Sequence, residues 1–165
     1  MTATIKGFEP LYIQRIAQLT NKSNQFNLTT LRCSEDDIRA MAGDKNDLCL
    51  CGKLVDKFGD NGIVTVVAGR QQDDVLDLTL WLMSCRVLKR GMEDAMMDTV
   101  VAEAAARGVK TIVGHYYPTA KNAMVREFYA QYDFAKTAED ADGNTEWTLD
   151  VAAYTPKHPH MKIER

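Results

Sequence analysis

The stretch Leu78-Thr79-Leu80-Trp81-Leu82-Met83 decides the fold of this chain. It is continuously apolar apart from Thr79, which is typical of a strand that is buried on both faces of a sheet. The run Ser84–Gly91 follows directly and cannot continue such a strand, because it is basic and ends in a glycine. The sequence therefore predicts a buried strand that ends at Met83 and opens into a basic loop.

A helix follows this loop. Apolar residues recur at helical spacing over Met92–Ala104, and Gly108 ends the pattern. A strand that passes through such a loop into a helix presents unpaired backbone N–H groups and the positive end of the helix dipole. The loop cations Arg86, Lys89 and Arg90 would strengthen the binding of a phosphate or pyrophosphate. The alternative is an ordinary strand-to-helix turn with solvated cations.

Length and composition narrow the class of protein. A chain of 165 residues suits one domain, which we expect over residues 8–153, with a leader over residues 1–7 and an extended tail over residues 154–165. The net charge of −3 argues against nucleic acid or an anionic membrane as the main partner. No segment has the length of a membrane span and no signal-peptide core is present, so we expect a soluble, cytoplasmic protein.

The cysteines and histidines do not have the spacing of a metal-binding site. The four cysteines are too few and too scattered for a disulfide framework. Cys49 and Cys51 alternate along a predicted strand, but two thiols without a second pair make a poor zinc site. His158 and His160 lie in the predicted tail. We therefore expect no bound metal.

Hydrophobic periodicity predicts a mixed α/β chain. In order, the predicted elements are a helix over Pro10–Thr20, a helix from Ser34 to Ala42, strands Asp47–Phe58 and Gly62–Ala68, the strand Val75–Met83, a helix from Met92, a strand Val109–Tyr116, a helix over Ala123–Tyr132 and a hairpin of Phe134–Ala138 with Glu146–Val151. Ser34 and Asp37 resemble a capping box. The helix between the strands that end at Met83 and begin at Val109 makes those two strands parallel.

The run Asn21–Thr30 is dense in amides and hydroxyls. Such side chains supply hydrogen-bond donors and acceptors without net charge, as a site for a polar organic group would. The predicted substrate-binding residues are Asn21, Asn24, Gln25 and Asn27. The alternative is a polar loop that enters an edge strand at Phe26–Leu31.

This order of elements resembles the GNAT acyltransferase fold, a central mixed and mostly antiparallel sheet flanked by helices. In that family the loop before the main helix has the pattern Arg/Gln-x-x-Gly-x-Gly/Ala, and its amides hold the pyrophosphate of acyl-CoA. Arg90–Ala95 aligns with this pattern, except that Glu93 replaces the central glycine. A carboxylate there can occupy the positive helix end that a phosphate would use. The resemblance implies that the cofactor-binding residues are Arg86, Lys89, Arg90, Gly91 and Ala95.

A second match lies in the last predicted helix, where Asn122, Tyr129 and Phe134 have the spacing of the GNAT family. The resemblance implies that Asn122 contacts the pantetheine arm and that Tyr129 protonates the departing thiolate. A phenol of pKa about 10 can protonate a thiolate of pKa about 8.5 if it lies at the sulfur. The alternatives are a helix cap for Asn122 and a core aromatic for Tyr129.

Two further residues are catalytic candidates. Cys85 is flanked by Arg86 near a predicted helix N-terminus, where a thiol with a lowered pKa can act as a transient acyl carrier. Its alternative is packing at the end of a buried strand. His115 ends the following strand and is a candidate base.

A narrower resemblance covers most of the chain. The strings Arg15–Thr30, Ser84–Leu88 and Pro118–Ala123 look like the C-terminal region of FkbH-like proteins, in which an acidic residue at the Glu93 position is usual. Those proteins pair a haloacid-dehalogenase-type phosphatase domain with a GNAT-like domain and load a glyceryl unit onto an acyl carrier protein for methoxymalonyl-type polyketide extenders. The Asp-x-Asp motif of the phosphatase is absent here, so the chain resembles an excised C-terminal domain or a stand-alone relative.

The resemblances lead to one main hypothesis and two alternatives. The main hypothesis is an acyltransferase domain for a small acyl thioester on phosphopantetheine, carried by an acyl carrier protein or CoA, with a phosphatase of the haloacid-dehalogenase type as a further partner. One alternative is a conventional N-acetyltransferase that uses acetyl-CoA. The other is a non-catalytic module that docks the carrier protein.

Overall fold

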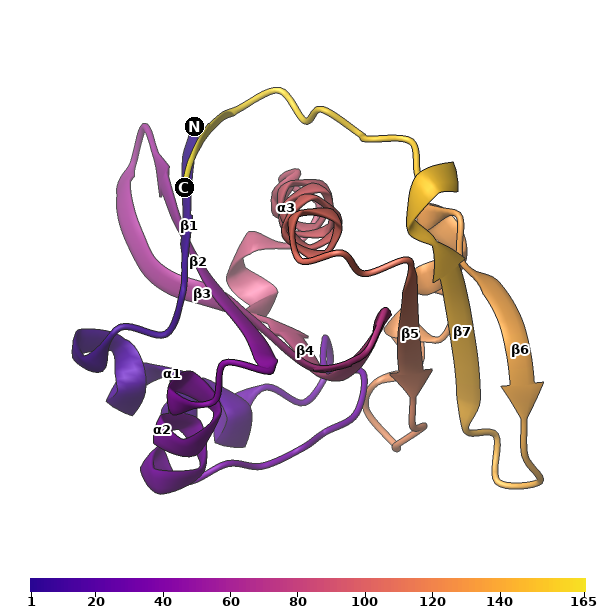
Figure 1. The fold of residues 1–165 in the computed structure, drawn as a ribbon. Helices are drawn as coiled ribbons and strands as arrows, with labels where there is room; N and C mark the ends of the chain where they lie inside the picture. Colours follow the sequence, from indigo (N-terminus) through magenta and orange to yellow (C-terminus); the bar gives the residue numbers. More distant parts are fainter.

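The computed structural model describes residues 1–165 and consists of one mixed sheet with helices on both faces (Figure 1). The eight strands have the order β6-β7-β5-β4-β3-β2-β1-β8. They are β1 (Thr2–Lys6), β2 (Asp47–Asp56), β3 (Gly59–Gln72), β4 (Val75–Met83), β5 (Thr111–Tyr116), β6 (Ala135–Glu139), β7 (Thr145–Asp150) and β8 (Lys162–Glu164). This architecture confirms the predicted fold class. None of the helices combines the length and the apolar character that a membrane-spanning helix needs.

Three helices cover the sheet. Helix α3 (Met92–Ala106) lies alone on one face, and α1 (Ile13–Lys22) and α2 (Glu35–Gly43) lie on the other (Figure 1). The core is accordingly divided into a large cluster on the α3 side and a smaller one on the α1 and α2 side. The predicted capping box is confirmed, because Asp37 N–H donates to Ser34 Oγ at 3.1 Å and Ser34 N–H donates to Asp37 Oδ2 at 2.9 Å.

Strands β4 and β5 pair for a short distance and then separate. They are parallel, as predicted, but only Val75, Leu76 and Asp77 of β4 have partners in β5. Strand β4 continues to Met83 in antiparallel pairing with β3, with a register shift at Ala68 and Gly69. From Leu78 onward the outer edge of β4 therefore has no neighbouring strand.

The segment Phe26–Thr30, which we call the plug, lies against this outer edge. Met83 N–H donates to the Phe26 carbonyl and Leu28 N–H donates to the Trp81 carbonyl, both at 3.0 Å. On its other side the Leu28 carbonyl accepts from Tyr117 N–H at 2.9 Å, just after β5. The plug makes one isolated bridge, Asn27 with Leu82, and is not the edge strand considered above.

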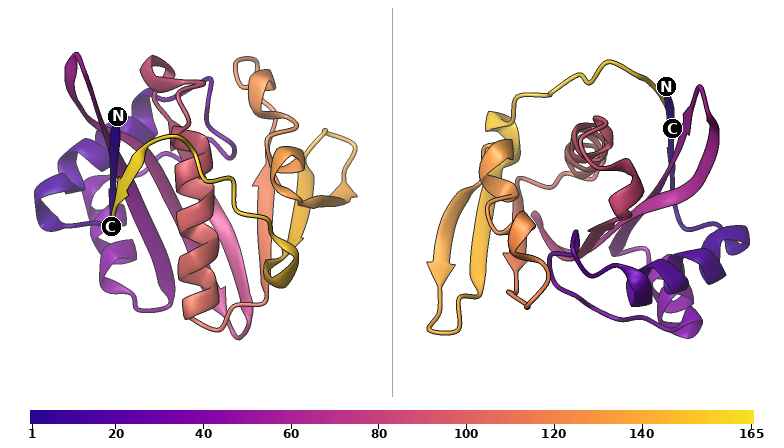
Figure 2. Two further views of the ribbon diagram at one scale, coloured as in Figure 1. Left: turned by 90° about the horizontal axis from the view of Figure 1, so that it is seen from above. Right: turned by 180° about the vertical axis from the view of Figure 1, so that it is seen from behind.

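The structure has a strand at each end of the chain, where the sequence predicted a leader and an extended tail. The expected leader over residues 1–7 contains β1, which pairs antiparallel with β2 and parallel with β8, and the expected tail contains β8. Figure 2 shows the tail passing over α3 to reach the edge of the sheet beside the N-terminus. Strands of five and three residues carry too little periodicity to be recognised, because their conformation is set by pairing with distant residues.

Two other predicted elements differ in detail. Residues 123–132 form two 3₁₀ turns, η3 (Ala123–Val125) and η4 (Tyr129–Tyr132), and not a continuous helix. Aromatic residues at Phe128, Tyr129 and Tyr132 pack against one another and against the core, so tertiary packing overrides the helical spacing. The hairpin of β2 and β3 turns at residues 57–58, because Asp56 pairs with Gly59 and β3 begins earlier than predicted.

Candidate functional site

The loop between β4 and α3 contains two residues in the left-handed backbone conformation. Its chain bends through the short turn η2 (Cys85–Val87), and both Lys89 and Gly91 have left-handed backbone angles, with φ of 60° and 88°. Gly91 is the N-cap of α3 and offers no side-chain cap, so the first N–H groups of the helix need another partner. A glycine fits this position because it adopts positive φ without strain.

The chain's own carboxylates occupy the start of α3. Glu93 Oε2 accepts a hydrogen bond from Lys89 N–H at 3.1 Å, and Glu93 Oε1 is buried without a hydrogen-bond partner. Asp94, the next residue, accepts from the Tyr132 hydroxyl at 2.6 Å. Negative charge is thus already present at the positive end of the helix dipole.

One of the three predicted phosphate-binding cations is paired within the chain. Arg90 is paired with Asp56, whose carboxylate is almost fully buried. Arg86 contacts Ser84 Oγ at 3.4 Å, while Lys89 is exposed, and neither forms a salt bridge. Two loop cations therefore remain available to an external anion.

Ala95 is not a loop residue. It is buried in α3, and its N–H donates to the Gly91 carbonyl at 3.1 Å as part of the helix. Its small side chain is a packing feature of the helix.

The amide-rich run mostly binds the chain itself. Asn21 Nδ2 donates to the carbonyls of Ala17 and Cys33 at 2.9 and 3.0 Å. Asn24 Oδ1 accepts from Arg32, and Asn27 is fully buried. The exception is Gln25, whose Oε1 lies 3.3 Å from the exposed thiol of Cys85, so the structure brings one predicted substrate residue to one predicted catalytic residue.

Asn122 has no free hydrogen-bonding group. Its Oδ1 accepts from Thr119 N–H at 2.8 Å and from the Tyr116 hydroxyl at 3.2 Å. Its Nδ2 donates to the carbonyls of Asn27 and Tyr117 at 2.9 and 3.0 Å. The residue occupies an N-cap position without capping, and it ties the plug to the chain that follows β5.

Tyr129 lies where β4 and β5 separate. Its ring packs edge-on against Trp81 of β4, and a Cβ at Gly114 of β5 would lie only 2.5 Å from the ring. Burial, and secondarily the negative charge of Asp77, raises the pKa of Tyr129 well above its ordinary value. The hydroxyl is therefore protonated at neutral pH.

His115 pairs with a carboxylate that the sequence analysis missed. Its Nε2 lies 2.5 Å from Asp77 Oδ1, and the side chains are 18% and 51% exposed. Asp77 lines a groove of about 420 Å³ together with Val113 and Glu146. The sequence signal for Asp77 was a single aspartate inside a predicted apolar strand. In the structure this residue lies in the part of β4 that pairs with β5.

A small cavity adjoins the start of α3. It has a volume of about 160 Å³ and is mostly apolar, with Glu93 and Lys89 as its charged residues. The remaining lining residues are Phe26, Leu88, Met124, Val125, Phe128, Gln131 and Tyr132. The plug, the basic loop and the two 3₁₀ turns thus meet at one place.

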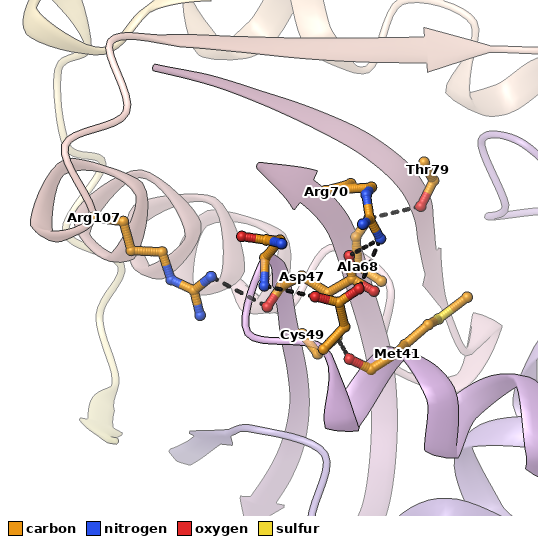
Figure 3. Close-up of polar contacts among 9 residues, drawn as sticks. Met41, Asp47, Cys49, Ala68, Arg70, Thr79 and Arg107 are labelled. Carbon is orange, nitrogen blue, oxygen red and sulfur yellow. Dashed lines mark hydrogen bonds and ion pairs between the residues drawn. The ribbon is translucent and has the colours of Figure 1, made fainter. Parts of the chain in front are cut away.

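A separate polar cluster is structural (Figure 3). Arg70 bridges Asp44 and Asp47 at 2.9 and 3.3 Å, and Cys49 Sγ contacts the Met41 carbonyl at 3.6 Å. Burial, with the charge of Asp47 next, raises the pKa of Cys49 to about 12, so this thiol stays protonated. No three His, Cys, Asp or Glu side chains are grouped as a metal site.

The fold is known from other proteins. No protein-family model matches the chain, and no curated protein matches its sequence. Among solved structures, the ribosomal-protein-S18-alanine N-acetyltransferase from Escherichia coli has 16% identity and a TM-score of 0.68, over 90% of this chain and 94% of that one. A GNAT-family acetyltransferase from Streptococcus pneumoniae has 15% identity and a TM-score of 0.65, over 90% and 98%. Spermidine N-acetyltransferase from Vibrio cholerae, solved with CoA and spermine, has 9% identity and a TM-score of 0.67, over 91% and 96%.

Proposed function

We propose that this chain, which has the GNAT acetyltransferase fold, is an acyltransferase for a small acyl thioester on the phosphopantetheine arm of an acyl carrier protein. The acyl group would be of the glyceryl or methoxymalonyl type, handled for polyketide extender units as in the FkbH-like proteins that the sequence resembles. The fold supports acyl transfer from a thioester. The sequence strings around residues 15–30, 84–88 and 118–123 support the choice of acyl group.

One observation carries the preference for a carrier protein over free CoA: Lys89 N–H already donates to Glu93 Oε2 at 3.1 Å. Free acyl-CoA would bring a diphosphate to the start of α3, where the Glu93 carboxylate takes the N–H group and repels the incoming charge. A carrier-bound arm has a single phosphodiester at the carrier's surface. The arm can therefore enter without placing a diphosphate on the helix end.

The exposed cations of the loop support a protein partner. Lys89 and Arg86 have no carboxylate partner in the chain. Acidic carrier proteins are steered toward such cations, and contacts of this kind act mainly on the association rate. In this proposal the two side chains hold the phosphodiester of the arm or the acidic surface around it.

Transfer would occur where β4 and β5 separate. The acceptor's O–H or N–H group loses its proton to His115, whose ring is oriented by Asp77 at 2.5 Å, and attacks the thioester carbonyl. The carbon–sulfur bond breaks, and the thiolate takes a proton from Tyr129. That hydroxyl holds its proton at neutral pH, but its raised pKa makes it a weaker acid, so this step requires the developing thiolate to lie directly at the Tyr129 oxygen.

Calorimetry with matched ligands tests the proposal. We expect micromolar binding of glyceryl-loaded holo carrier protein and at least about tenfold weaker binding of acetyl-CoA, the factor that 1.4 kcal/mol of repulsion produces. Glu93→Gln removes the negative charge and should therefore reduce the difference in affinity between the loaded carrier protein and acetyl-CoA. Glu103→Gln, on the exposed face of α3, should leave this difference unchanged. Micromolar acetyl-CoA binding by the unmodified chain, with turnover of an amine, would instead establish a conventional N-acetyltransferase.

The plug favours a second candidate, a module that docks the carrier protein without chemistry. The plug forms hydrogen bonds with the Met83 N–H and the Trp81 carbonyl of β4, next to the buried Tyr129. It therefore occupies the strand edge beside the residue that would have to reach the thioester. Such a module would bind the loaded carrier, leave its thioester intact and be insensitive to Tyr129→Phe. Loss of the thioester in the presence of the unmodified chain, slowed by Tyr129→Phe, would exclude it.

A further inference from the structure

The outer edge of β4 has the form of a binding site that the chain itself fills. The Trp81 carbonyl and the Met83 N–H are spaced as in any strand edge, and Leu28 N–H and the Phe26 carbonyl satisfy them at 3.0 Å. An extended ligand with amide groups would make the same two bonds, because strand addition needs only main-chain-like donors and acceptors.

The C-terminal end of the plug is strained. Thr30 has a φ of 56°, a left-handed conformation that is an outlier for a β-branched residue. Its Oγ1 is buried without a hydrogen-bond partner in the chain. The indole Nε1 of Trp81, the residue that Leu28 contacts, is buried and unpartnered as well. Strain and orphaned polar atoms both reduce the free-energy advantage of the filled edge.

Other contacts hold the plug in place. Phe26 and Leu28 are buried in the core cluster on the α3 side. Thr29 Oγ1 donates to the Thr79 carbonyl at 2.8 Å, and Asn122 Nδ2 donates to the Asn27 carbonyl at 2.9 Å. The conformation in which the plug is bound to β4 is therefore the ground state. Because Thr30 is strained, the plug should begin to separate from β4 at this end.

We propose that the plug is an autoinhibitory strand that leaves β4 when the phosphopantetheine arm binds. The arm's amide groups would then pair with the Trp81 carbonyl and the Met83 N–H, and Leu28 would lose its partner on β4. This inference rests on the proposed function for the identity of the ligand. The opening of the plug is a property of the chain alone.

The arm can bind only to molecules in which the plug has left β4, which we call the open state. The apparent affinity therefore equals the intrinsic affinity multiplied by the fraction of open molecules. Thr29→Val removes one hydrogen bond at constant shape and should raise the open fraction about fivefold. Thr30→Asn keeps a polar side chain and tolerates left-handed φ, so it should lower the open fraction several-fold. The two neighbouring substitutions therefore act in opposite directions.

Hydrogen exchange followed by NMR tests the opening without any ligand. The Leu28 and Met83 amides should exchange together, faster than the β4 amides that face β3. Thr29→Val should speed this exchange about fivefold, and Thr30→Asn should slow it. If both amides exchange only with the global unfolding rate, in all three proteins, the plug is a fixed part of the sheet and the inference is wrong.

Adding holo carrier protein then separates the inference from the proposed function. The expected result is that the Met83 amide stays protected while the Leu28 amide loses protection. Carrier binding with both amides protected as before would overturn the displacement. If the carrier does not bind, the proposed function fails, and displacement by this arm fails with it, whereas the exchange rates without ligand still decide whether the plug opens.

Discussion

The side-chain amide of Asn122 donates to the backbone carbonyl of Asn27 at 2.9 Å, which joins two loops that lie 95 residues apart in the chain. The contact is fully buried, and the other groups of Asn122 bind Tyr116, Tyr117 and Thr119. A residue predicted to bind a cofactor arm therefore fixes the position of the plug.

Replacing Asn122 with Ala should destabilise the fold strongly. The change leaves buried donors and acceptors on Asn27, Tyr117 and Thr119 without partners, and we expect a loss of about 3 kcal/mol. Urea unfolding measures it. Lys121→Ala, an exposed neighbour, is the control and should stay within about 0.5 kcal/mol. A loss below about 1 kcal/mol at Asn122 would contradict the role of this network.

Gly114 should not tolerate a methyl group. A Cβ there would lie 2.5 Å from the Tyr129 ring, so Gly114→Ala should lower the free energy of unfolding by about 2 kcal/mol through overpacking. In a Tyr129→Leu background the penalty should shrink, since the ring is gone; this coupling is measured with a double-mutant cycle. Gly43→Ala, which meets no atom within 4 Å, serves as the control. Additive losses would show that the two residues do not clash.

Stability should fall in alkali because of Cys51. Burial, and next the charge of Glu9, raises the pKa of this thiol from 9.0 to about 12. Below pH 9 both states hold the Cys51 proton; between about pH 9 and 12 only the unfolded chain releases it, so this thiol lowers the free energy of unfolding by about 1.4 kcal/mol per pH unit, and Cys49 adds a similar loss. Urea unfolding at rising pH should give a shallower slope for Cys51→Ala than for the unmodified chain. An unchanged slope in Cys51→Ala would contradict the role of this thiol.

His115 and Asp77 should differ in their effect on transfer. If His115 is the base, His115→Gln should lower kcat by about 100-fold or more, because proton transfer to a positioned base contributes at least that factor. Asp77→Asn should have a smaller effect, also on kcat and not on KM, because Asp77 orients the ring. Glu103→Gln, on the exposed face of α3, is the control. The assay follows loss of the loaded carrier's thioester; unchanged kcat in His115→Gln would rule out this base.

Asp98 should hold the C-terminal strap, residues 154–165. Its carboxylate accepts from the Tyr154 hydroxyl at 2.5 Å and from Lys157 and His158 N–H at 2.9 and 3.0 Å. Asp98→Ala should therefore speed tryptic cleavage after Lys157 about tenfold or more, since each charge-assisted bond contributes roughly 1.5 kcal/mol or more. Glu103→Ala on the same helix should leave the rate unchanged. Mass spectrometry of the digest measures both.

Elements with strong local signals could be predicted from the sequence. β4 has the bounds that its apolar run indicates, and the box formed by Ser34 and Asp37 opens α2 at the expected residue. β1 and β8 could not be predicted, because three to five residues gain strand conformation only from their partners. The helix predicted over residues 123–132 was wrong for a related reason, because the packing of its aromatic side chains outweighs the helical spacing of the sequence.

The candidate site was predictable in its residues but not in their pairing. The basic loop and the acidic Glu93 follow from the sequence pattern, whereas the left-handed backbone of Gly91 and the bond from Lys89 N–H to Glu93 are seen only in the structure. The amides of Asn21–Asn27 could equally serve a ligand or the backbone, and composition cannot separate these uses. Asp77 was missed because its partner, His115, is distant in sequence.

The parallel pairing of β1 with β8 also sets an order of events during synthesis. β1 leaves the ribosome long before its partner Lys162–Glu164, which lies about 160 residues later in the chain. Throughout that interval the outer edge of β1 offers free N–H and carbonyl groups, which is the condition under which nascent chains associate edge to edge. Closure of the sheet is therefore a late event of folding, and a nascent chain arrested before β8 carries an open, aggregation-prone edge.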